Sequence, residues 1–299
     1  MSILVVGSVA FDTIKTPFGE ARKVLGGSAT YFSMAARIFS PVNLVAVVGR
    51  DFPSRYLDLF RKKGIDILGL KQAPGKTFYW EGEYGWDFSD PKTLTTDLNV
   101  FADFNPKIPE SYKKSRYVFL ANIDPVLQEK VLAQIKRPQL VASDTMNHWI
   151  SSKPGQLLKL LKKVDIFFLN ASEAKQLTSE ANLVKAGKKI LKSGPKVVVV
   201  KKGEHGVIMF SKNNIFTAPA YLLESVYDPT GAGDSFAGAF IGYLAKSGKI
   251  NQAVLRKAVI YANVVATFTV EAFSIDRLAK VTVSQVKQRL KKFKQYTAF

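Results

Sequence analysis

The chain reads Asp228-Pro229-Thr230-Gly231-Ala232-Gly233-Asp234-Ser235-Phe236-Ala237-Gly238-Ala239-Phe240 at the point that decides its fold. Gly231, Ala232 and Gly233 form a turn of small residues, and the apolar residues after it recur at the spacing of one helix face. Such a turn at the start of a helix leaves several backbone N–H groups unpaired. Together with the helix dipole, these N–H groups form a site for an anion.

Asp234 places a carboxylate in the first turn of this helix, where the anion would sit. A carboxylate beside a bound anion is electrostatically unfavourable unless it has a chemical role. One role that fits is to accept the proton of a hydroxyl group as it attacks a phosphoryl group. The simpler alternative is that Gly231 and Gly233 only make a tight strand-to-helix connection, with Asp234 as a favourable first-turn acid.

The whole stretch resembles the second signature of the PfkB (ribokinase-like) family of carbohydrate and nucleoside kinases, D-[TP]-[TN]-[GA]-A-G-D-[ST]-F-x-[GA]. The resemblance implies an α/β fold, a ribokinase-like three-layer sandwich with a mostly parallel central sheet and a small β lid. It implies one kinase domain over residues 1–299. It also makes Asp234 the catalytic base and makes the N–H groups of Gly231, Ala232 and Gly233 the anion hole.

Composition supports a folded globular chain. Its 299 residues suit one large α/β domain or two ordinary ones, and 47% of them are hydrophobic. No apolar run approaches the length of a membrane span, and the sequence begins with a strand-like Ile3-Leu4-Val5-Val6 instead of a signal peptide. The chain has no cysteine, which excludes disulfides and thiolate catalysis and fits a cytoplasmic location.

The charge balance is strongly basic, with 43 Lys and Arg against 24 Asp and Glu, a formal net charge of +19. In the last segment the apolar residues form one stripe and the lysines fall elsewhere, as on a solvated helix face. No zinc-finger spacing, helix-turn-helix pattern or RNA-binding aromatic signature is present. We therefore expect a basic surface without a specific polynucleotide partner, which would help to attract ATP and other anions.

Strand-like runs alternate with helical patterns along most of the chain. The runs are Ile3–Ser8, Asn43–Gly49, Tyr117–Ala121, Gln139–Ser143, Asp165–Leu169 and Lys196–Lys201, followed by a hairpin to Val207–Ser211. This alternation predicts a mostly parallel sheet with helices on both faces. After Tyr243 the pattern is mainly helical, through Asn251–Val270 and a basic C-terminal helix.

Two segments do not fit the alternation. Phe11–Val24 reads as a turn-rich excursion, and Lys76–Val100 carries aromatic residues between acidic and turn residues, as in short antiparallel strands. The aromatic residues could form no more than a small satellite core. The family resemblance implies instead that both segments, at about 11–24 and 76–100, form the β lid over the sugar site.

Several residues near the N-terminus are candidates for binding the phosphate acceptor. Asp12 follows the first strand, and Gly26-Gly27 precedes a helix; either feature alone is common in turns. The resemblance implies that Asp12 accepts sugar hydroxyls and that the double glycine contacts the sugar. Tyr31 stands near the position where ribokinase has a sugar-binding Asn, and Asn122 and Asp124 are further candidates.

The candidates for the nucleotide and its metal ion lie later in the chain. Ser172 or Asn170 could simply cap a helix, with Glu173 as a favourable first-turn acid. Asn170 and Glu173 also match the N-x-x-E motif of the family, and the resemblance implies that the Glu organises Mg²⁺ and water around the phosphates. The resemblance also assigns nucleotide contacts to Lys201, Gly203, Gly206 and Asn263.

The resemblance further implies a site for a monovalent cation such as K⁺, held by Asp228 and Thr230. In ribokinase a later glycine-containing loop completes this site, whereas this chain has Val270-Glu271-Ala272-Phe273-Ser274. Glu271 could itself supply a charge at that place.

Together these features predict an ATP-dependent, Mg²⁺-requiring kinase that phosphorylates a hydroxymethyl group of a sugar, a furanose or a related carbohydrate. A nucleoside kinase and a non-catalytic regulator that binds nucleotide or sugar on the same fold are the alternatives. A polynucleotide-binding protein is a third hypothesis that no readout motif supports. The resemblance also allows a homodimer through the lid.

Overall fold

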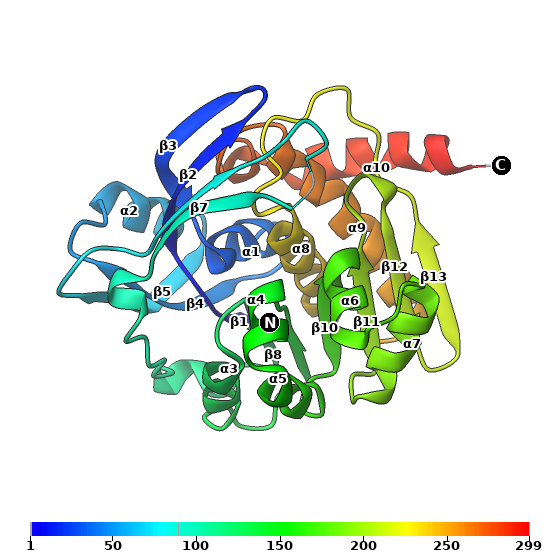
Figure 1. Ribbon diagram of the computed structural model, residues 1–299, viewed down its shortest axis with the longest axis horizontal. Helices are drawn as coiled ribbons and strands as arrows, with labels where there is room; N and C mark the ends of the chain where they lie inside the picture. Colours follow the sequence, from blue (N-terminus) through cyan, green and yellow to red (C-terminus); the bar gives the residue numbers. More distant parts are fainter. Residues whose placement is uncertain (1, 89, 299) are drawn as a thin grey trace.

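The computed structural model describes residues 2–88 and 90–298, and a nine-stranded sheet forms its centre (Figure 1). The strand order is β13-β12-β11-β10-β9-β8-β1-β4-β5. The strands are β1 (Ile3–Val6), β4 (Val42–Gly49), β5 (Ile65–Ala73), β8 (Tyr117–Leu120), β9 (Leu140–Ser143), β10 (Ile166–Asn170), β11 (Val197–Lys201), β12 (Val207–Ser211) and β13 (Asn214–Ala218). All neighbours pair in parallel except β11 with β12 and β12 with β13.

Helices cover both faces of this sheet. They are α1 (Ser28–Ala36), α2 (Ser54–Lys62), α3 (Pro125–Leu132), α4 (Asn147–Ser152), α5 (Pro154–Leu161), α6 (Ala171–Thr178), α7 (Leu183–Lys192), α8 (Ala232–Ser247), α9 (Gln252–Val270) and α10 (Val283–Thr297). Alternate residues of β1 enter different cores, since Ile3 and Val5 pack with α1, α8 and α9 while Leu4 and Val6 pack with α3, α5 and α7. The predicted three-layer α/β sandwich is confirmed.

Two strands were absent from the sequence prediction. β5 and β13 lie at the two edges of the sheet, and only about half of the residues in each are apolar. A strand at an edge is covered less completely than a central strand, so neither shows the continuous apolar run that marked the others.

The segments that broke the alternation form a second sheet, of order β3-β2-β6-β7. Its strands are β2 (Ala10–Thr16), β3 (Gly19–Gly26), β6 (Tyr79–Glu83) and β7 (Lys92–Asp97). β6 and β7 are antiparallel, as expected. The expectation of a turn-rich excursion at Phe11–Val24 is wrong: this segment belongs to a β-hairpin, and β2 also pairs in parallel with β6.

The helix α9 is the one described helix that is long and apolar enough to cross a membrane by length and composition. It lies within the fold, where it packs against α8 and α10 and contributes Leu255, Val259 and Phe268 to the core (Figure 1). Its apolar character is therefore explained by burial in the protein.

The helices α1 and α8 approach each other closely beside β8. Phe32 of α1 stacks on Phe119 of β8 with ring centroids 4.1 Å apart. A Cβ atom placed on Gly238 of α8 would lie 2.3 Å from the carbonyl oxygen of Phe32. Glycine at this position therefore sets how closely the two helices pack.

We expect Gly238→Ala to lower the free energy of unfolding by about 1–3 kcal/mol, because the added methyl group meets backbone instead of a movable side chain. Denaturant titration measures the change. Gly155→Ala is the matched control: nothing lies within 4 Å of the place that its Cβ atom would take, so the better helix propensity of alanine should leave stability equal or slightly higher. Equal stabilities of Gly238→Ala and the unsubstituted chain would contradict the packing argument.

Candidate active site

The turn Gly231–Gly233 begins the helix α8. Gly231 is its N-cap residue, with a φ of 74°, and it provides no side chain to cap the first-turn N–H groups. A Cβ atom at Gly231 would lie 2.2 Å from the ring of Tyr31. Only glycine suits both the positive φ and this close contact. The uncapped end of a sixteen-residue helix is a ready site for a phosphate group.

The carboxyl group of Asp234 lies in the first turn of α8 and is partly buried. Burial raises its pKa well above the ordinary value, and the nearby charge of Asp144 raises it further, while Lys201 opposes both. A carboxylate with a raised pKa is a stronger base once ionised, which suits proton transfer from a hydroxyl group near neutral pH.

Lys201 ends β11 and points to the same turn. Its Nζ atom lies 2.9 Å from Oδ2 of Asp144 and would lie 2.9 Å from a Cβ atom on Gly233. Burial by itself would lower the pKa of Lys201, but the negative charges of Asp144, Glu173 and Asp234 outweigh it and raise that pKa. A charged ammonium group therefore faces the predicted anion hole.

Asp144 was missed by the sequence analysis. It directly follows β9 and is buried, and its Oδ1 atom accepts a hydrogen bond from the N–H of Thr145. The available signal was its position, because Asn170 and Lys201 also stand at the carboxyl ends of neighbouring parallel strands. Such ends meet at one edge of the sheet, where ligands of open α/β sheets bind.

Asn170 and Glu173 form a reciprocal capping box at the start of α6. Oδ1 of Asn170 accepts from the N–H of Glu173 at 2.8 Å, and Oε2 of Glu173 accepts from the N–H of Asn170 at 2.6 Å. The capping role considered for Asn170 is thus present, with Glu173 as its partner. Burial raises the pKa of Glu173 to about 7, against the opposing charge of Lys201.

The donor set around the turn suits Mg²⁺ in company with phosphates. The carboxyl groups of Asp144 and Glu173 both raise the pKa of Asp234, so a divalent cation would relieve their mutual repulsion. Within residues 2–88 and 90–298 no three acidic or histidine side chains form a metal-binding group by themselves. A Mg²⁺ ion at this place would therefore take its remaining ligands from phosphate and water.

The predicted acceptor residues Asp12, Gly26 and Gly27 come together in space. Asp12 lies on β2 and is 4% exposed. A Cβ atom on Gly26 would lie 1.8 Å from Oδ2 of Asp12, and the backbone of Gly27 hydrogen-bonds to the Asp12 carboxyl group. Burial raises the pKa of Asp12 to about 7, and the charge of Asp228 adds to the shift.

Tyr31 links the acceptor residues to the turn. Its ring packs on Gly231, and its buried hydroxyl group has no hydrogen-bond partner among the described residues. Burial raises the pKa of Tyr31 well above its usual value, and the charges of Asp228, Asp12 and Asp234 contribute in the same direction. The hydroxyl group of Tyr31 therefore lies among the carboxyl groups of the site.

Asp228 and Thr230, the predicted cation ligands, are engaged with the chain itself. Asp228 is buried and accepts from the N–H of Thr230 at 2.8 Å and from the N–H of Ser274 at 3.1 Å. The hydroxyl group of Thr230 donates to that of Tyr84 at 3.2 Å. The carboxylate of Asp228 thus ties the loop after α9 to the turn before α8.

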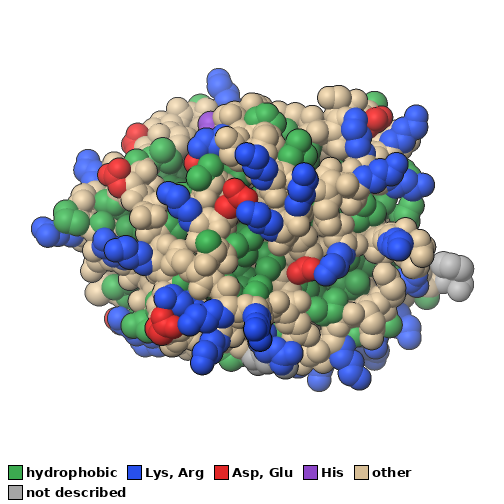
Figure 2. All heavy atoms as spheres, turned by 90° about the horizontal axis from the view of Figure 1, so that it is seen from below, with side chains coloured by type: hydrophobic (Ala, Val, Ile, Leu, Met, Phe, Trp, Pro, Cys, Tyr) green, Lys and Arg blue, Asp and Glu red, His purple; other side chains and the backbone are tan. Residues whose placement is uncertain are grey.

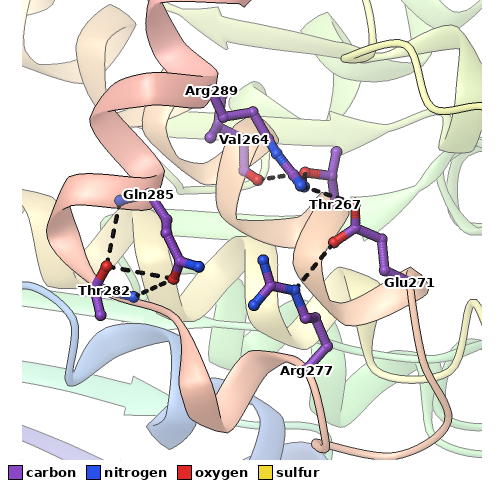
Figure 3. Close-up of polar contacts among 7 residues, drawn as sticks. All are labelled: Val264, Thr267, Glu271, Arg277, Thr282, Gln285 and Arg289. Atoms are coloured by element: carbon purple, nitrogen blue, oxygen red, sulfur yellow. Dashed lines mark hydrogen bonds and ion pairs between the residues drawn. The ribbon is translucent and has the colours of Figure 1, made fainter.

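Glu271, in the loop after α9 where the resemblance to ribokinase predicted the rest of the cation site, faces two guanidinium groups (Figure 3). Its carboxylate lies 2.8 Å from Nη2 of Arg289 and 3.5 Å from Nε of Arg277. Arg289 also donates to the hydroxyl group of Thr267 at 2.6 Å and lies over the ring of Phe268. The charge of Glu271 is therefore neutralised by this cluster.

Other predicted residues use their polar groups elsewhere. Oδ1 of Asn122 accepts from the indole of Trp149, and Asp124 caps α3 and pairs with Lys153. The amide group of Asn263 holds the backbone of Pro219 and Tyr221. For these three, the side chain stabilises local structure, and any ligand contact would have to compete with these bonds.

The two glycines of the β11–β12 turn differ from each other. Gly206 has a φ of 84° and passes close to β13, since its Cβ atom would lie 2.1 Å from the carbonyl oxygen of Ala218. Gly203 has a φ of 56°, and a Cβ atom there would meet nothing within 4 Å. Gly206 is explained by strand packing, while a side chain at Gly203 would meet open space.

The loop between β6 and β7 reaches both halves of the site. Tyr84 contacts Thr230 next to the turn before α8, and the carboxylate of Asp90 accepts from the hydroxyl group of Ser172 at 2.9 Å. Phe18, at the turn between β2 and β3, packs on Phe88 of the same loop. The small sheet, which carries Asp12, is therefore also connected to the turn before α8 and to the start of α6.

The raised pKa of Asp12 predicts that folding stability depends on pH. The folded state holds the Asp12 proton up to about pH 7, whereas the unfolded chain releases it near the ordinary pKa of 3.8. The protonated Asp12 therefore stabilises the folded state fully below about pH 4, and this stabilisation is lost as the pH rises to about 7. Between pH 4.5 and 7.5 we expect the unfolding free energy of Asp12→Asn to fall by about 3 kcal/mol less than that of the unsubstituted protein. Denaturant titrations across this range measure it, and parallel curves for both proteins would contradict the shift.

Comparison with known proteins agrees with this geometry. The profile of the pfkB family carbohydrate kinases matches residues 2–278. A cytidine kinase of Thermococcus kodakarensis is 28% identical over 85% of this chain and 92% of its own length. The solved nucleoside kinase of Methanocaldococcus jannaschii, an archaeal member of the ribokinase family, superposes with a TM-score of 0.79 at 22% identity, over 97% of this chain and 98% of that one.

An Escherichia coli structure described as a ribokinase II in complex with ATP and Mg²⁺ superposes equally well, with a TM-score of 0.79 at 18% identity over 97% of this chain and 99% of that one. These likenesses establish the ribokinase-like fold. The family match covers nearly the whole chain. The protein therefore belongs to the pfkB family of carbohydrate kinases and is a phosphotransferase that acts on an alcohol group.

Proposed function

We propose that this protein transfers the γ-phosphoryl group of ATP to the hydroxymethyl group of a furanose. The observation that carries the proposal is that Asp234 stands in the N-terminal turn of α8, next to Gly233, whose Cβ position is 2.9 Å from the Nζ atom of Lys201. The charges of both Lys201 and Asp12 act on its carboxyl group. Bound Mg²⁺·ATP would supply the phosphoryl group and charge neutralisation.

In the proposed reaction the carboxylate of Asp234 takes the proton of the acceptor hydroxyl group. The hydroxyl oxygen forms a bond to the γ-phosphorus while the bond from that phosphorus to the β–γ bridging oxygen breaks, and ADP leaves. The N–H groups of Gly231, Ala232 and Gly233 and the ammonium group of Lys201 stabilise the charge on the transferring phosphoryl group. Asp144 holds Lys201 in place through their 2.9 Å contact.

The acceptor would lie between Asp12 and Asp234, under the small sheet as a lid. A carboxylate left without its hydroxyl partners is costly when buried, so Asp12 would select for sugar hydroxyls. A nucleoside is the second candidate, because the cytidine kinase relative aligns over 92% of its own length. A panel of free pentoses, hexoses and nucleosides, assayed for acceptor-dependent ADP formation, distinguishes the two.

The proposal also includes the cellular location and the oligomeric state of the enzyme. A chain without cysteine that uses ATP and Mg²⁺ suits the cytoplasm. Association of two chains through the small sheet is a further part of the proposal, which the mass of the protein in solution would test.

We expect Asp234→Asn to lower turnover by at least about 100-fold while leaving ATP and acceptor affinity nearly unchanged, because the amide keeps the shape but cannot take the proton. Steady-state kinetics with the acceptor found by the panel and ATP titration calorimetry separate the two effects. Asp103→Asn, an exposed carboxylate changed in the same way, is the matched control and should behave as the unsubstituted enzyme. Near-normal turnover of Asp234→Asn would remove this residue from the mechanism.

We expect only weak activation by K⁺, less than about tenfold when it replaces Na⁺, which corresponds to under ~1.4 kcal/mol. The physical reason is that Asp228 already accepts two backbone N–H bonds and Glu271 is neutralised by Arg277 and Arg289. Initial rates at constant ionic strength in Na⁺ and in K⁺ measure the effect. A larger response would show that the loop at Glu271 rearranges to bind the ion.

A further inference from the structure

The end of the molecule opposite the active site carries a row of basic turns. The strands β8, β9, β10 and β11 are parallel and adjacent, so the turns that precede them lie at one edge of the sheet, away from Asp144, Asn170 and Lys201. The cations of these turns are Lys113, Lys114, Arg116, Lys136, Arg137, Lys162, Lys163, Lys192 and Lys196. We call this set the basic edge.

Backbone contacts join neighbouring turns of the basic edge. The N–H of Lys136 donates to the carbonyl oxygen of Lys113 at 2.8 Å, and that of Lys196 donates to Asp165 at 2.9 Å. Gly194, in the turn before β11, packs against the backbone of Lys162 in the turn before β10. The four turns therefore lie side by side along this edge of the sheet. Figure 2, which shows the molecule from below, has many Lys and Arg side chains on that face and fewer acidic ones.

Acidic neighbours neutralise only part of this charge. Glu110 pairs with Lys113 and Lys136, Glu129 pairs with Lys163, and Asp165 pairs with Lys196. Among the described residues no ion pair engages the remaining five cations, all of them exposed: Lys114, Arg116, Arg137, Lys162 and Lys192. An excess of like charge on one surface is unfavourable unless an anionic partner or solution ions offset it.

The spacing of these cations matches a regular polyanion. Four adjacent strands, about 4.8 Å apart, spread the turns over about 14 Å. Double-stranded nucleic acid carries one phosphate charge per about 1.7 Å of its axis, so a segment of that length presents about eight phosphates. Phosphate contacts of this kind need no base recognition, which agrees with the lack of a readout motif in the sequence.

The lack of exposed apolar side chains at the basic edge favours a duplex over a single strand or a membrane surface as its partner. Among residues 2–88 and 90–298, the large aromatic side chains that are exposed all lie outside the basic edge: Phe18, Trp86, Tyr227 and Tyr296. Single strands are bound with aromatic residues that stack on the bases, and membrane surfaces with apolar residues that enter the lipid. None of the exposed large hydrophobic residues belongs to these four turns.

We propose that the basic edge binds the phosphate backbone of double-stranded nucleic acid without regard to sequence. The binding surface is separate from the kinase site, since the two lie at opposite ends of the same parallel strands. This inference therefore stands whether or not the proposed acceptor is correct.

The test uses the full-length enzyme and a random-sequence 24-base-pair DNA duplex, with affinity measured by fluorescence anisotropy as a function of NaCl concentration. Five phosphate contacts predict a slope of about −4 to −5 in a plot of log K against log salt. In the fourfold variant Lys114→Gln, Arg116→Gln, Lys162→Gln and Lys192→Gln we expect the slope to shrink by about 3–4 and low-salt affinity to fall at least about tenfold.

The matched control removes four exposed lysines of α10, in Lys287→Gln, Lys291→Gln, Lys292→Gln and Lys294→Gln. It loses the same net charge and should bind the duplex within about threefold of the unsubstituted enzyme, while both variants keep their kinase activity. Equal weakening of both variants would assign the binding to net charge alone and overturn the proposal. Failure of the unsubstituted enzyme to bind the duplex, or its binding only to single strands or anionic vesicles, would overturn it as well.

Discussion

The contact between Tyr31 and Gly231 connects everything that the site requires. It joins α1, which follows Gly26 and Gly27, to the start of α8, which carries the Gly231–Gly233 turn and Asp234. A side chain at residue 231 would collide with the aromatic ring, and its positive φ would be strained as well. The two halves of the site can therefore come together only because one position has no side chain.

Electrostatics sets the second constraint. Asp12, Asp228 and Asp234 are brought close enough to influence one another, and burial raises the pKa of each. This arrangement lowers the stability of the ligand-free protein near neutral pH. Cations and hydroxyl donors near these carboxylates would stabilise their charged forms, and Lys201, a metal ion and an acceptor are groups of these kinds. The instability and the proposed chemistry thus have the same physical origin.

Because the central strands are parallel, all their carboxyl ends lie at one edge of the sheet and all their amino ends at the opposite edge. At their carboxyl ends stand the acids and Lys201 of the kinase site, and at their amino ends stand the turns of the basic edge. The cations at the two edges of the sheet therefore differ in how far acidic side chains neutralise them. At the site Lys201 is paired with Asp144, whereas at the other end five cations have no ion-pair partner among the residues that the structure describes.

The sequence by itself determined the central strands, the turn before α8 and the family, because apolar runs and a thirteen-residue motif are local signals. It could not reveal Asp144, the edge strands β5 and β13, or the pairing of Glu271 with Arg277 and Arg289. Those features depend on segments far apart in the chain. A carboxylate after a strand becomes part of the site only when the fold places Lys201 2.9 Å away from it. Distances of this kind follow from packing, which no single stretch of sequence specifies.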